Sequence, residues 1–307
     1  MVGDEGYISI DGKITAIKDG HIPPLDRSWL FGDRLIETMV GYGDRLWNFA
    51  SHQKRLRLSA KKLGFSIPWS DEDLKQECQR LLQHLQVPKA FVRLMISRGE
   101  GFGLWPSKHS PHRYIYALKA MAVEKAIYSR GLHLLSCKTT WGSVTGHKTG
   151  YYLPAITALQ ALDDTKADDI LWLASPTNCG DVLASKQHYH ILESSSAHIV
   201  CIDKGSIIIP GLEEWGIFPG ITVAEIKDIC RLDGIEVAEK FITYEEFSSM
   251  NGCFLCSSVR GLVPVSKVDD ISFQTTAKDS LFWSIFDLYY KKRPIHPLDN
   301  LSQLTVS

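Results

Sequence analysis

The residue with the clearest chemical potential in this sequence is Lys148, which stands in the short segment 146–150 (GHKTG). A lysine amine can form an imine with a carbonyl group, leave it again, and carry protons at the neighbouring carbon. Such a lysine must lose its own proton near neutral pH, which burial or a nearby positive charge makes possible. A lysine that simply follows a histidine is usually a solvated surface residue. Lys148 therefore has to be weighed together with the segments on either side of it.

A second segment has the features of an anion site. Residues 219–222 (PGIT) contain a glycine that lets the backbone approach a ligand, and we expect a helix over residues 223–232 directly after them. The N–H groups and the dipole at the start of a helix favour a bound phosphate. The alternative is an ordinary loop in which Thr222 caps the helix.

The order and spacing of several motifs carry more weight than any single one. These motifs are residues 26–33 (DRSWLFGD), 146–153 (GHKTGYYL), 193–196 (ESSS), 218–222 (FPGIT) and 257–261 (SSVRG). The ordered set resembles the fold type IV pyridoxal-phosphate (PLP) enzymes, that is, the class IV aminotransferase family. That family includes branched-chain and D-amino-acid transaminases and 4-amino-4-deoxychorismate lyase. The resemblance covers the chain from about residue 6 to about residue 290.

The resemblance implies a role for each matching residue. Lys148 would carry the Schiff base to PLP and shuttle the α-proton of the substrate. The cofactor-binding residues would be Arg55 (phosphate), Ile221 and Thr222 (phosphate, at the helix start), Ser258 (second phosphate hydroxyl), Glu193 (pyridine nitrogen) and Tyr152 (phenolic oxygen). Taken alone, each has an ordinary explanation: Arg55 as a surface helix charge, Glu193 as a solvated loop carboxylate and Tyr152 as a core aromatic.

The same resemblance implies a fold and a reaction. We expect an α+β fold with two lobes, a smaller α/β N-terminal lobe and a larger C-terminal lobe with a pseudo-barrel, and a homodimer. The expected reaction is ping-pong amino transfer between an amino acid and a 2-oxo acid. One alternative is pyruvate elimination from 4-amino-4-deoxychorismate, which gives 4-aminobenzoate for the folate pathway. Another is a fold kept for binding only, and the joint presence of Lys148, Arg55 and Glu193 argues against it.

Three arginines are candidates for binding a substrate carboxylate, namely Arg93, Arg98 and Arg260. Alternation along a strand puts Arg93 and Arg98 on opposite faces, so we do not expect both to serve. No Arg-x-His pair follows Arg98, which argues against the D-amino-acid subgroup. The pair Glu37–Thr38 looks more like the transaminase branch.

Several positions depart from the family pattern. His198 and Val200 replace a common Asn and Phe, Tyr151 stands where Asn is frequent, and Arg34 occupies a position that is usually small. The segment between residues 173 and 193 is also longer than usual. An insertion there could displace Glu193, in which case the expected partner of the pyridine nitrogen would be lost.

Bulk properties permit this interpretation without requiring it. The chain has 307 residues, 44% of them hydrophobic, which is enough for a sizeable core. A formal net charge of −1 gives no electrostatic signal for nucleic acid or an anionic membrane, and leaves small metabolites as ligands. No apolar run approaches the ~20 residues that cross a bilayer. The start of the sequence has no basic segment followed by an apolar one, so we expect a cytoplasmic protein.

Cysteine and histidine clusters suggest no metal. Seven scattered cysteines fit a reducing compartment. The pair Cys253-x-x-Cys256 lies in an apolar run that indicates a buried strand. His188, His190 and His198 have no Asp or Cys partner at ligand spacing.

Hydrophobic patterns alternate between helix and strand throughout the chain. Asp11 and Gly12 predict a type I′ hairpin over residues 6–17, and helices are expected over residues 51–63, 71–85 and 153–162. Strands are expected over residues 90–97, 114–118, 169–173 and 197–202. We expect an N-terminal lobe over residues 1–122, a linker over 123–130, a cofactor-binding lobe over 131–290 and a flexible tail over 291–307.

Overall fold

The computed structural model describes residues 2–105, 110–139, 146–175, 188–211 and 219–298. The chain divides into two compact units. Unit 1 comprises Met1–Ala122 together with the short segment His147–Tyr151, and unit 2 comprises Val123–Gly146 and Tyr152–Leu298. The segment that carries Lys148 therefore packs with the first unit, although the second unit surrounds it in the sequence.

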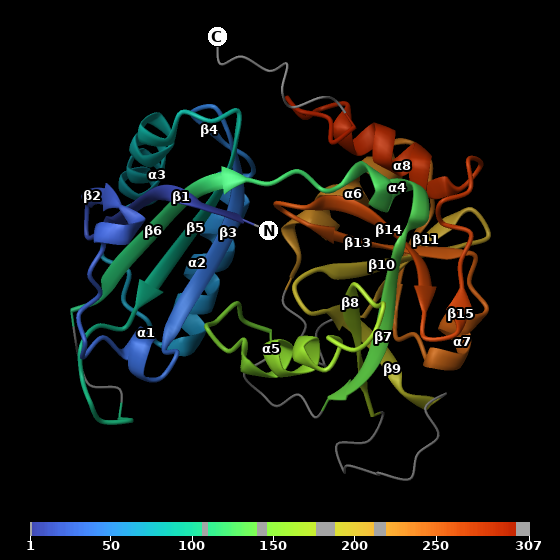
Figure 1. The fold of residues 1–307 in the computed structure, drawn as a ribbon, viewed down its shortest axis with the longest axis horizontal. Helices are drawn as coiled ribbons and strands as arrows, with labels where there is room; N and C mark the ends of the chain where they lie inside the picture. Colours follow the sequence, from blue (N-terminus) through green and yellow to red (C-terminus); the bar gives the residue numbers. More distant parts are fainter. Residues whose placement is uncertain (1, 106–109, 140–145, 176–187, 212–218, 299–307) are drawn as a thin grey trace. The chain divides into compact units, whose positions relative to one another are not determined.

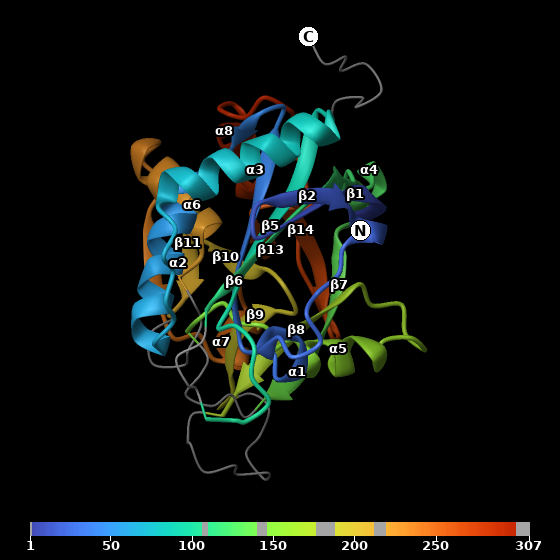
Figure 2. The same cartoon turned by 90° about the vertical axis from the view of Figure 1, so that its left-hand side faces the viewer.

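Unit 1 is built on one six-stranded antiparallel sheet with the strand order β2-β1-β6-β5-β3-β4. The strands are β1 (Val2–Ile10), β2 (Lys13–Ala16), β3 (Arg34–Tyr42), β4 (Arg45–Leu46), β5 (Lys89–Ser97) and β6 (His112–Ala120). Two long helices, α2 (Phe49–Leu63) and α3 (Asp71–Leu85), pack against one face of this sheet (Figures 1 and 2). The shorter helices η1 (Ile17–Asp19) and α1 (Arg27–Leu30) lie in the connection between β2 and β3.

Local sequence signals set the ends of the first hairpin and of α3. Asp11 and Gly12 have φ angles of 49° and 94°, the left-handed conformations that the predicted type I′ turn requires. Ser70 accepts a hydrogen bond from the backbone N–H of Asp73, and the Asp73 carboxylate accepts one from the Ser70 N–H. This capping box starts α3 at the predicted residue.

The beginning of α2 differs from the prediction. The helix starts at Phe49, and Asn48 takes the cap position in the left-handed conformation with φ 54°. Ser51 therefore lies inside the first turn and does not cap the helix. Asparagine tolerates the left-handed region better than most residues, which allows the earlier start. The predicted stop at Gly64 is confirmed, since that residue has φ 67°.

The core of unit 1 follows the alternation of its central strands. Leu35 and Met39 of β3 point to the helix-covered face and are fully buried, together with Val92 and Leu94 of β5. Glu37 stands between Leu35 and Met39 in the same phase of β3, so the alternation brings a carboxylate into an otherwise apolar layer.

Unit 2 contains a nine-stranded sheet. Its strands are β7 (Leu132–Thr139), β8 (Asp169–Ala174), β9 (His190–Ser194), β10 (His198–Asp203), β11 (Ser206–Pro210), β12 (Val237–Lys240), β13 (Gly252–Ser257), β14 (Gly261–Val268) and β15 (Ile271–Ser272). The order is β12-β11-β10-β13-β14-β7-β8-β9, with β15 paired to β14. Because β9 also pairs with β10, the strands β10, β13, β14, β7, β8 and β9 form a closed ring. The predicted α+β class and the barrel-like second lobe are thus confirmed.

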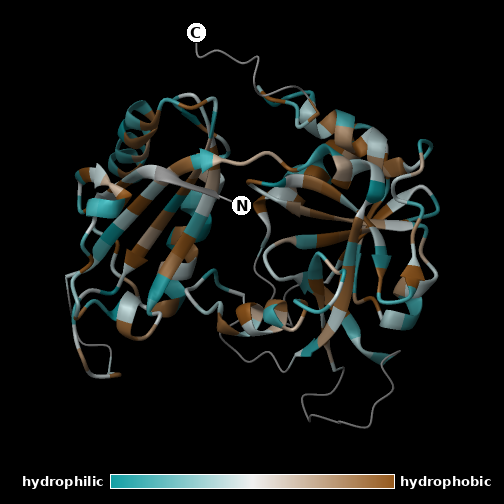
Figure 3. Ribbon diagram, viewed as in Figure 1, coloured by the Kyte–Doolittle hydropathy of each residue, from teal (hydrophilic) through white to brown (hydrophobic). Residues whose placement is uncertain are grey.

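The helices of unit 2 are α4 (Lys125–Arg130), α5 (Leu153–Gln160), α6 (Ile221–Leu232), α7 (Tyr244–Ser248) and α8 (Leu281–Tyr290). Hydrophobic residues, brown in Figure 3, run along the strands of the sheet. Side chains of β10 and β13 alternate between two cores. Cys201 and Leu255 face the cluster around Phe247, whereas Val200 and Phe254 face α6 and α8.

Among the described residues, no helix combines the length and the apolar character needed to cross a bilayer.

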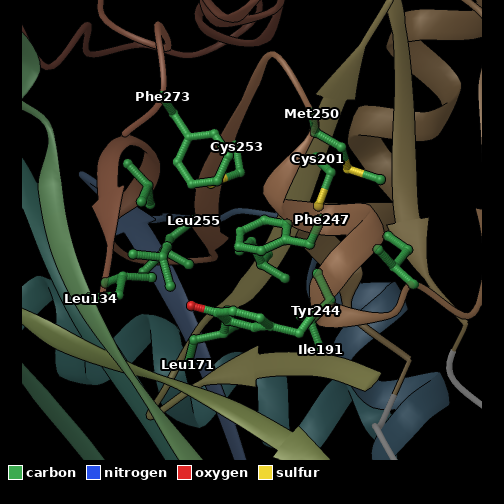
Figure 4. Packing of buried hydrophobic residues seen from close by; sticks show 14 of the residues in the cluster. Leu134, Leu171, Ile191, Cys201, Tyr244, Phe247, Met250, Cys253, Leu255 and Phe273 are labelled. Atoms are coloured by element: carbon green, nitrogen blue, oxygen red, sulfur yellow. The ribbon is translucent and has the colours of Figure 1, made fainter. Parts of the chain in front are cut away.

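Phe247, from α7, forms the centre of the first of these cores. It is fully buried, and its ring centroid lies 5.0 Å from that of Phe273. Figure 4 shows it among Cys201, Cys253 and Leu255. The Cys253-x-x-Cys256 pair lies in a buried strand, as predicted, and burial raises the pKa of both thiols. Thiols held protonated in this way are poor nucleophiles and poor metal ligands.

The structure differs from the predicted linker and tail. Residues 125–130 form α4, and Tyr128 is buried with its ring centroid 5.3 Å from that of Phe286. Beyond α8, Arg293 is buried, pairs with Glu225 at 2.8 Å and stacks on Tyr289. The linker is therefore part of unit 2, and the chain still packs against that unit beyond residue 291, where polar and proline residues suggested a tail.

Candidate functional site

The backbone around Lys148 is attached to the edge of β3 in unit 1. The Ile36 N–H donates to the carbonyl oxygen of Lys148 at 2.9 Å, and Thr149 forms an isolated antiparallel bridge with Leu35. A side chain at Gly150 would not fit here, because a Cβ at this position would lie 2.6 Å from Nε of Arg34. The hydrogen bond, the bridge and this close packing attach the backbone that carries the lysine to β3.

A buried ionic cluster occupies the neighbouring part of unit 1. Arg55 Nε and Nη2 donate to the two carboxylate oxygens of Glu37 at 2.8 and 2.6 Å, and His52 Nδ1 lies 2.6 Å from Glu37 Oε2. Glu37 comes from β3, whereas His52 and Arg55 stand three residues apart on one face of α2. A bidentate pair of this kind fixes the plane of the guanidinium as well as its position.

The protonation of this cluster follows from burial and charge. Burial opposes ionisation of Glu37, but the hydrogen bonds and charges of Arg55 and His52 outweigh it and lower the pKa of the carboxyl. Burial lowers the pKa of His52 and outweighs the hydrogen bond and charge of Glu37, which raise it, while the charges of Arg55 and Lys148 lower it further. At neutral pH this buried cluster near Lys148 therefore consists of the Glu37 carboxylate, the Arg55 guanidinium and a neutral His52 imidazole.

In unit 2, Glu193 lies on β9 and is only 5% exposed. Its partner in the sheet is His198 of β10, whose Nδ1 lies 3.4 Å from Glu193 Oε2. The predicted insertion before Glu193 falls mainly on residues 176–187, which lie outside the described residues. Glu193 is thus a carboxylate held inside the protein, at the end of the strand ring, rather than a solvated loop residue.

The start of α6 differs from the simple capped helix considered above. The helix begins at Ile221, two residues before the predicted start, and Gly220 occupies the cap position without a side-chain hydrogen bond. Thr222 is therefore a residue of the first turn, buried, with its hydroxyl 3.5 Å from that of Ser258. Two hydroxyls thus meet beside the N–H groups of the first turn, and such groups suit an anion.

Ser258 and Arg260 lie in the turn between β13 and β14. The turn is closed by Gly261, which has φ 72°, and a Cβ there would overlap the Tyr290 hydroxyl. The side chain of Arg260 is 38% exposed, and its Nη1 lies 3.6 Å from the buried carboxylate of Asp169.

Tyr152 occupies the N-cap position of α5 and is half-buried.

The other two arginines have different surroundings. Arg93 on β5 donates from Nε to the Thr38 hydroxyl at 3.2 Å and stacks on the Phe91 ring with Cζ 4.9 Å from its centroid, while within the described residues its two terminal nitrogens have no hydrogen-bond partner. Arg98 uses its guanidinium inside unit 1: it pairs with Asp33 at 3.0 Å and donates to the carbonyls of Leu63 and Gly64. These contacts fix the loop after α2.

Sequence reasoning missed roles for Glu37 and His52. Their signal was present, since Glu37 interrupts the buried apolar phase of β3 and a charge in that phase requires a partner. His52 and Arg55 share one face of α2 and supply it. Within unit 1 the structure thus brings together Arg55 and the Lys148 segment, and within unit 2 it brings together Thr222 and Ser258.

The family description "Amino-transferase class IV" matches residues 34–268, which is more than half of the chain. This chain belongs to the class IV aminotransferase family. A branched-chain-amino-acid aminotransferase of Pseudomonas aeruginosa is 23% identical over 280 residues, which cover 88% of this chain and 87% of that protein. Enzymes of the class IV family depend on PLP, so the cofactor predicted from the sequence is confirmed.

Solved structures of class IV family members share the fold. The branched-chain amino acid aminotransferase of Escherichia coli superposes with a TM-score of 0.82 at 19% identity, over 94% of each chain. The 4-amino-4-deoxychorismate lyase of P. aeruginosa gives a TM-score of 0.79 at 21% identity, over 94% of this chain and all of that one. Members with different reactions therefore match this fold about equally well.

The residues in place fit PLP chemically. The start of α6 has a glycine at its cap and two hydroxyls beside its first turn, which suits a phosphate. Glu193 is a buried carboxylate that can accept a hydrogen bond from a protonated ring nitrogen. Lys148 offers an amine of the kind that this chemistry uses, and its backbone is bonded to β3.

Proposed function

We propose that this protein is a PLP-dependent aminotransferase that moves an amino group between an amino acid and a 2-oxo acid. The observation that carries the proposal is the attachment of the Lys148 segment to β3, the strand that also supplies Glu37 to the buried cluster with Arg55. In that arrangement the lysine that matches the family motif has a fixed backbone beside a buried ionic cluster. A surface lysine has no need of either.

Lys148 acts in this proposal as the proton carrier of the reaction. Its amine would take a proton from the substrate α-carbon and return it to the cofactor carbon on the other side of the amino nitrogen. Arg55 donates to the cofactor phosphate, in a plane that Glu37 fixes through both of its oxygens.

The residues of unit 2 bind and orient the cofactor. The N–H groups of Ile221 and Thr222 and the hydroxyls of Thr222 and Ser258 bind the phosphate. Glu193 accepts from the ring nitrogen and keeps it protonated, and Tyr152 donates to the phenolic oxygen. When bound, PLP supplies the electron sink that makes the substrate α-proton acidic.

We propose Arg93 as the first candidate for binding a substrate carboxylate. Thr38 accepts from Nε and orients the guanidinium, while the terminal nitrogens have no hydrogen-bond partner among the described residues. Arg260 is the second candidate, because its side chain is partly exposed and its contact with Asp169 is long. Arg98, whose guanidinium holds Asp33 and two carbonyls, is not included among the proposed substrate residues.

The reaction is tested with purified protein supplied with PLP. Conversion of the near-visible band to the pyridoxamine form by an amino acid, and its return with a 2-oxo acid, would support amino transfer. Pyruvate and 4-aminobenzoate formed from 4-amino-4-deoxychorismate would instead support the lyase. Failure of every substrate to change the spectrum would favour a fold kept for binding alone.

We also propose a homodimer, supported by exposed apolar side chains. Arg27 donates to the backbone carbonyls of Gly103 and Leu104 and so fixes the loop that contains them. In this loop the side chains of Leu104 and Trp105 are 79% and 84% exposed. Patches of this kind commonly become buried on association. Sedimentation should show a dimer that Trp105→Ser weakens. Leu232→Ser serves as control, because Leu232 is equally exposed at the end of α6.

A further inference from the structure

His198 is one of the positions at which this sequence departs from its family, and the structure gives it two neighbours. One edge of the imidazole faces Glu193, with Nδ1 3.4 Å from Oε2. Both side chains are nearly inaccessible to solvent, at 9% and 7% exposure for His198 and Glu193. A buried carboxylate needs such a partner, since burial otherwise favours its neutral form.

The other edge of the ring packs against the chain that leads into α6. A Cβ built on Gly220 would lie 2.5 Å from both Cδ2 and Nε2 of His198, closer than any real contact. Gly220 has φ −74°, which any residue can adopt, so its backbone angle does not demand glycine. The imidazole is therefore what excludes a side chain at the cap of α6.

The same ring thus contacts two parts of unit 2 that are far apart in the sequence. Glu193 belongs to β9, and Gly220 immediately precedes Ile221 and Thr222. Strand alternation explains how this comes about, because His198 is in the same phase of β10 as Val200, which packs in the cluster that includes α6.

We propose that His198 is a positioning residue that holds the Glu193 carboxylate and the N-terminus of α6 in one fixed arrangement. The inference rests on the proposed function, in which Glu193 binds the ring nitrogen of PLP and the start of α6 binds its phosphate. Both groups belong to one rigid cofactor. A shared support keeps those two groups at the spacing the cofactor requires. The smaller asparagine common in the family would reach Glu193 but would leave space beside Gly220.

The packing half of the proposal is tested by stability alone, without cofactor. Gly220→Ala should lower the melting temperature of the wild-type chain, because the added methyl meets the imidazole. In a His198→Ala background the same substitution should cost little, since the ring is gone. If Gly220→Ala lowers the melting temperature equally in both backgrounds, the imidazole does not exclude the side chain and this half of the proposal is wrong.

The positioning half is tested by titrating the full chain with PLP and following its near-visible absorption. His198→Ala should weaken PLP binding about tenfold, the low end of what a polar contact with a charged group contributes. Its effect should be smaller when Glu193→Gln is already present, because the two act through one contact. His198→Asn should recover part of the affinity, since its amide can still donate to the carboxylate.

Val200→Ala is the matched control. It removes two methyl groups from a fully buried side chain in the same phase of β10, two residues further along, and should lower stability without changing PLP affinity. Equal affinity losses in Val200→Ala and His198→Ala would reduce His198 to an ordinary core residue and overturn the inference. A wild-type chain that binds PLP beside an equally good His198→Ala variant would overturn it as well. A wild-type chain that binds no PLP would instead overturn the proposed function, and this inference with it.

Discussion

Arg55 and Glu37 meet through two parallel hydrogen bonds, Nε to Oε1 at 2.8 Å and Nη2 to Oε2 at 2.6 Å, in the core of unit 1. Glu37 is 1% exposed, and its carboxylate also contacts His52. A buried carboxylate with two such partners is ionised, and the arginine it holds cannot easily turn away. The pair therefore converts a flexible side chain into a fixed positive group.

Replacing Glu37 by glutamine should damage both stability and cofactor binding. Breaking a buried pair from one side costs about 3–5 kcal/mol, because the remaining charge is left without its partner. Arg55 would also lose its fixed plane, so PLP affinity should fall. Chemical denaturation and a PLP titration measure the two effects.

Glu77→Gln provides the control for that experiment. Glu77 is also buried in unit 1, where Ser9 and Arg113 donate to it at 2.5 and 2.6 Å. Its replacement should cost comparable stability but leave PLP affinity unchanged. If both variants lose affinity alike, the Glu37 effect is a consequence of general destabilisation.

The pKa of His52 predicts a dependence of stability on pH. Burial holds this pKa below its usual value of 6.5 in the folded protein. As the pH falls through 6.5, the unfolded chain takes up the proton first, so stability is full above that pH and declines below it. Denaturation measured from about pH 8 to about pH 5 should show this decline, and His52→Gln should make the curve flatter.

The hydroxyls of Thr222 and Ser258 should act on the phosphate specifically. Loss of a hydrogen bond to a charged group costs about 1.5–3 kcal/mol, roughly 10- to 100-fold in affinity. Thr222→Ala should therefore weaken PLP binding by that factor. Pyridoxal, which has no phosphate, should bind the variant and the wild type equally. An equal loss for both ligands would contradict a phosphate contact.

Gly261 should tolerate no side chain for two separable reasons. Its φ of 72° costs other residues about 1–2 kcal/mol, and an added Cβ would overlap the Tyr290 hydroxyl. Gly261→Ala should therefore lower the melting temperature, and Tyr290→Phe should restore part of the loss by removing the hydroxyl. No restoration would mean that backbone strain alone sets the cost.

Much of this fold follows from short-range patterns. The hairpin at Asp11–Gly12, the capping box at Ser70 and the buried strand around Cys253 were all predictable, because each depends on residues a few positions apart. The pairing of β9 with β10, which closes the strand ring, was not predicted, and only a pseudo-barrel in the second lobe was expected from the resemblance. Long-range pairing is decided by the whole sheet rather than by local propensity.

The residues of the candidate site also fall into a predicted group and an unpredicted group. Lys148, Thr222 and Ser258 were identified by motif, and the paired hydroxyls of the last two are visible in the structure. The support of the site was not predicted. Glu37 meets Arg55, and His198 meets Gly220, across elements whose packing local patterns do not specify.

The most direct test of the central claim is to load the protein with PLP, reduce it with borohydride and map the modified peptide by mass spectrometry. The account predicts that the cofactor is found on Lys148 and that Lys148→Ala yields no modified peptide under the same conditions. A cofactor attached to another lysine, or a Lys148→Ala variant labelled as fully as the wild type, would contradict it.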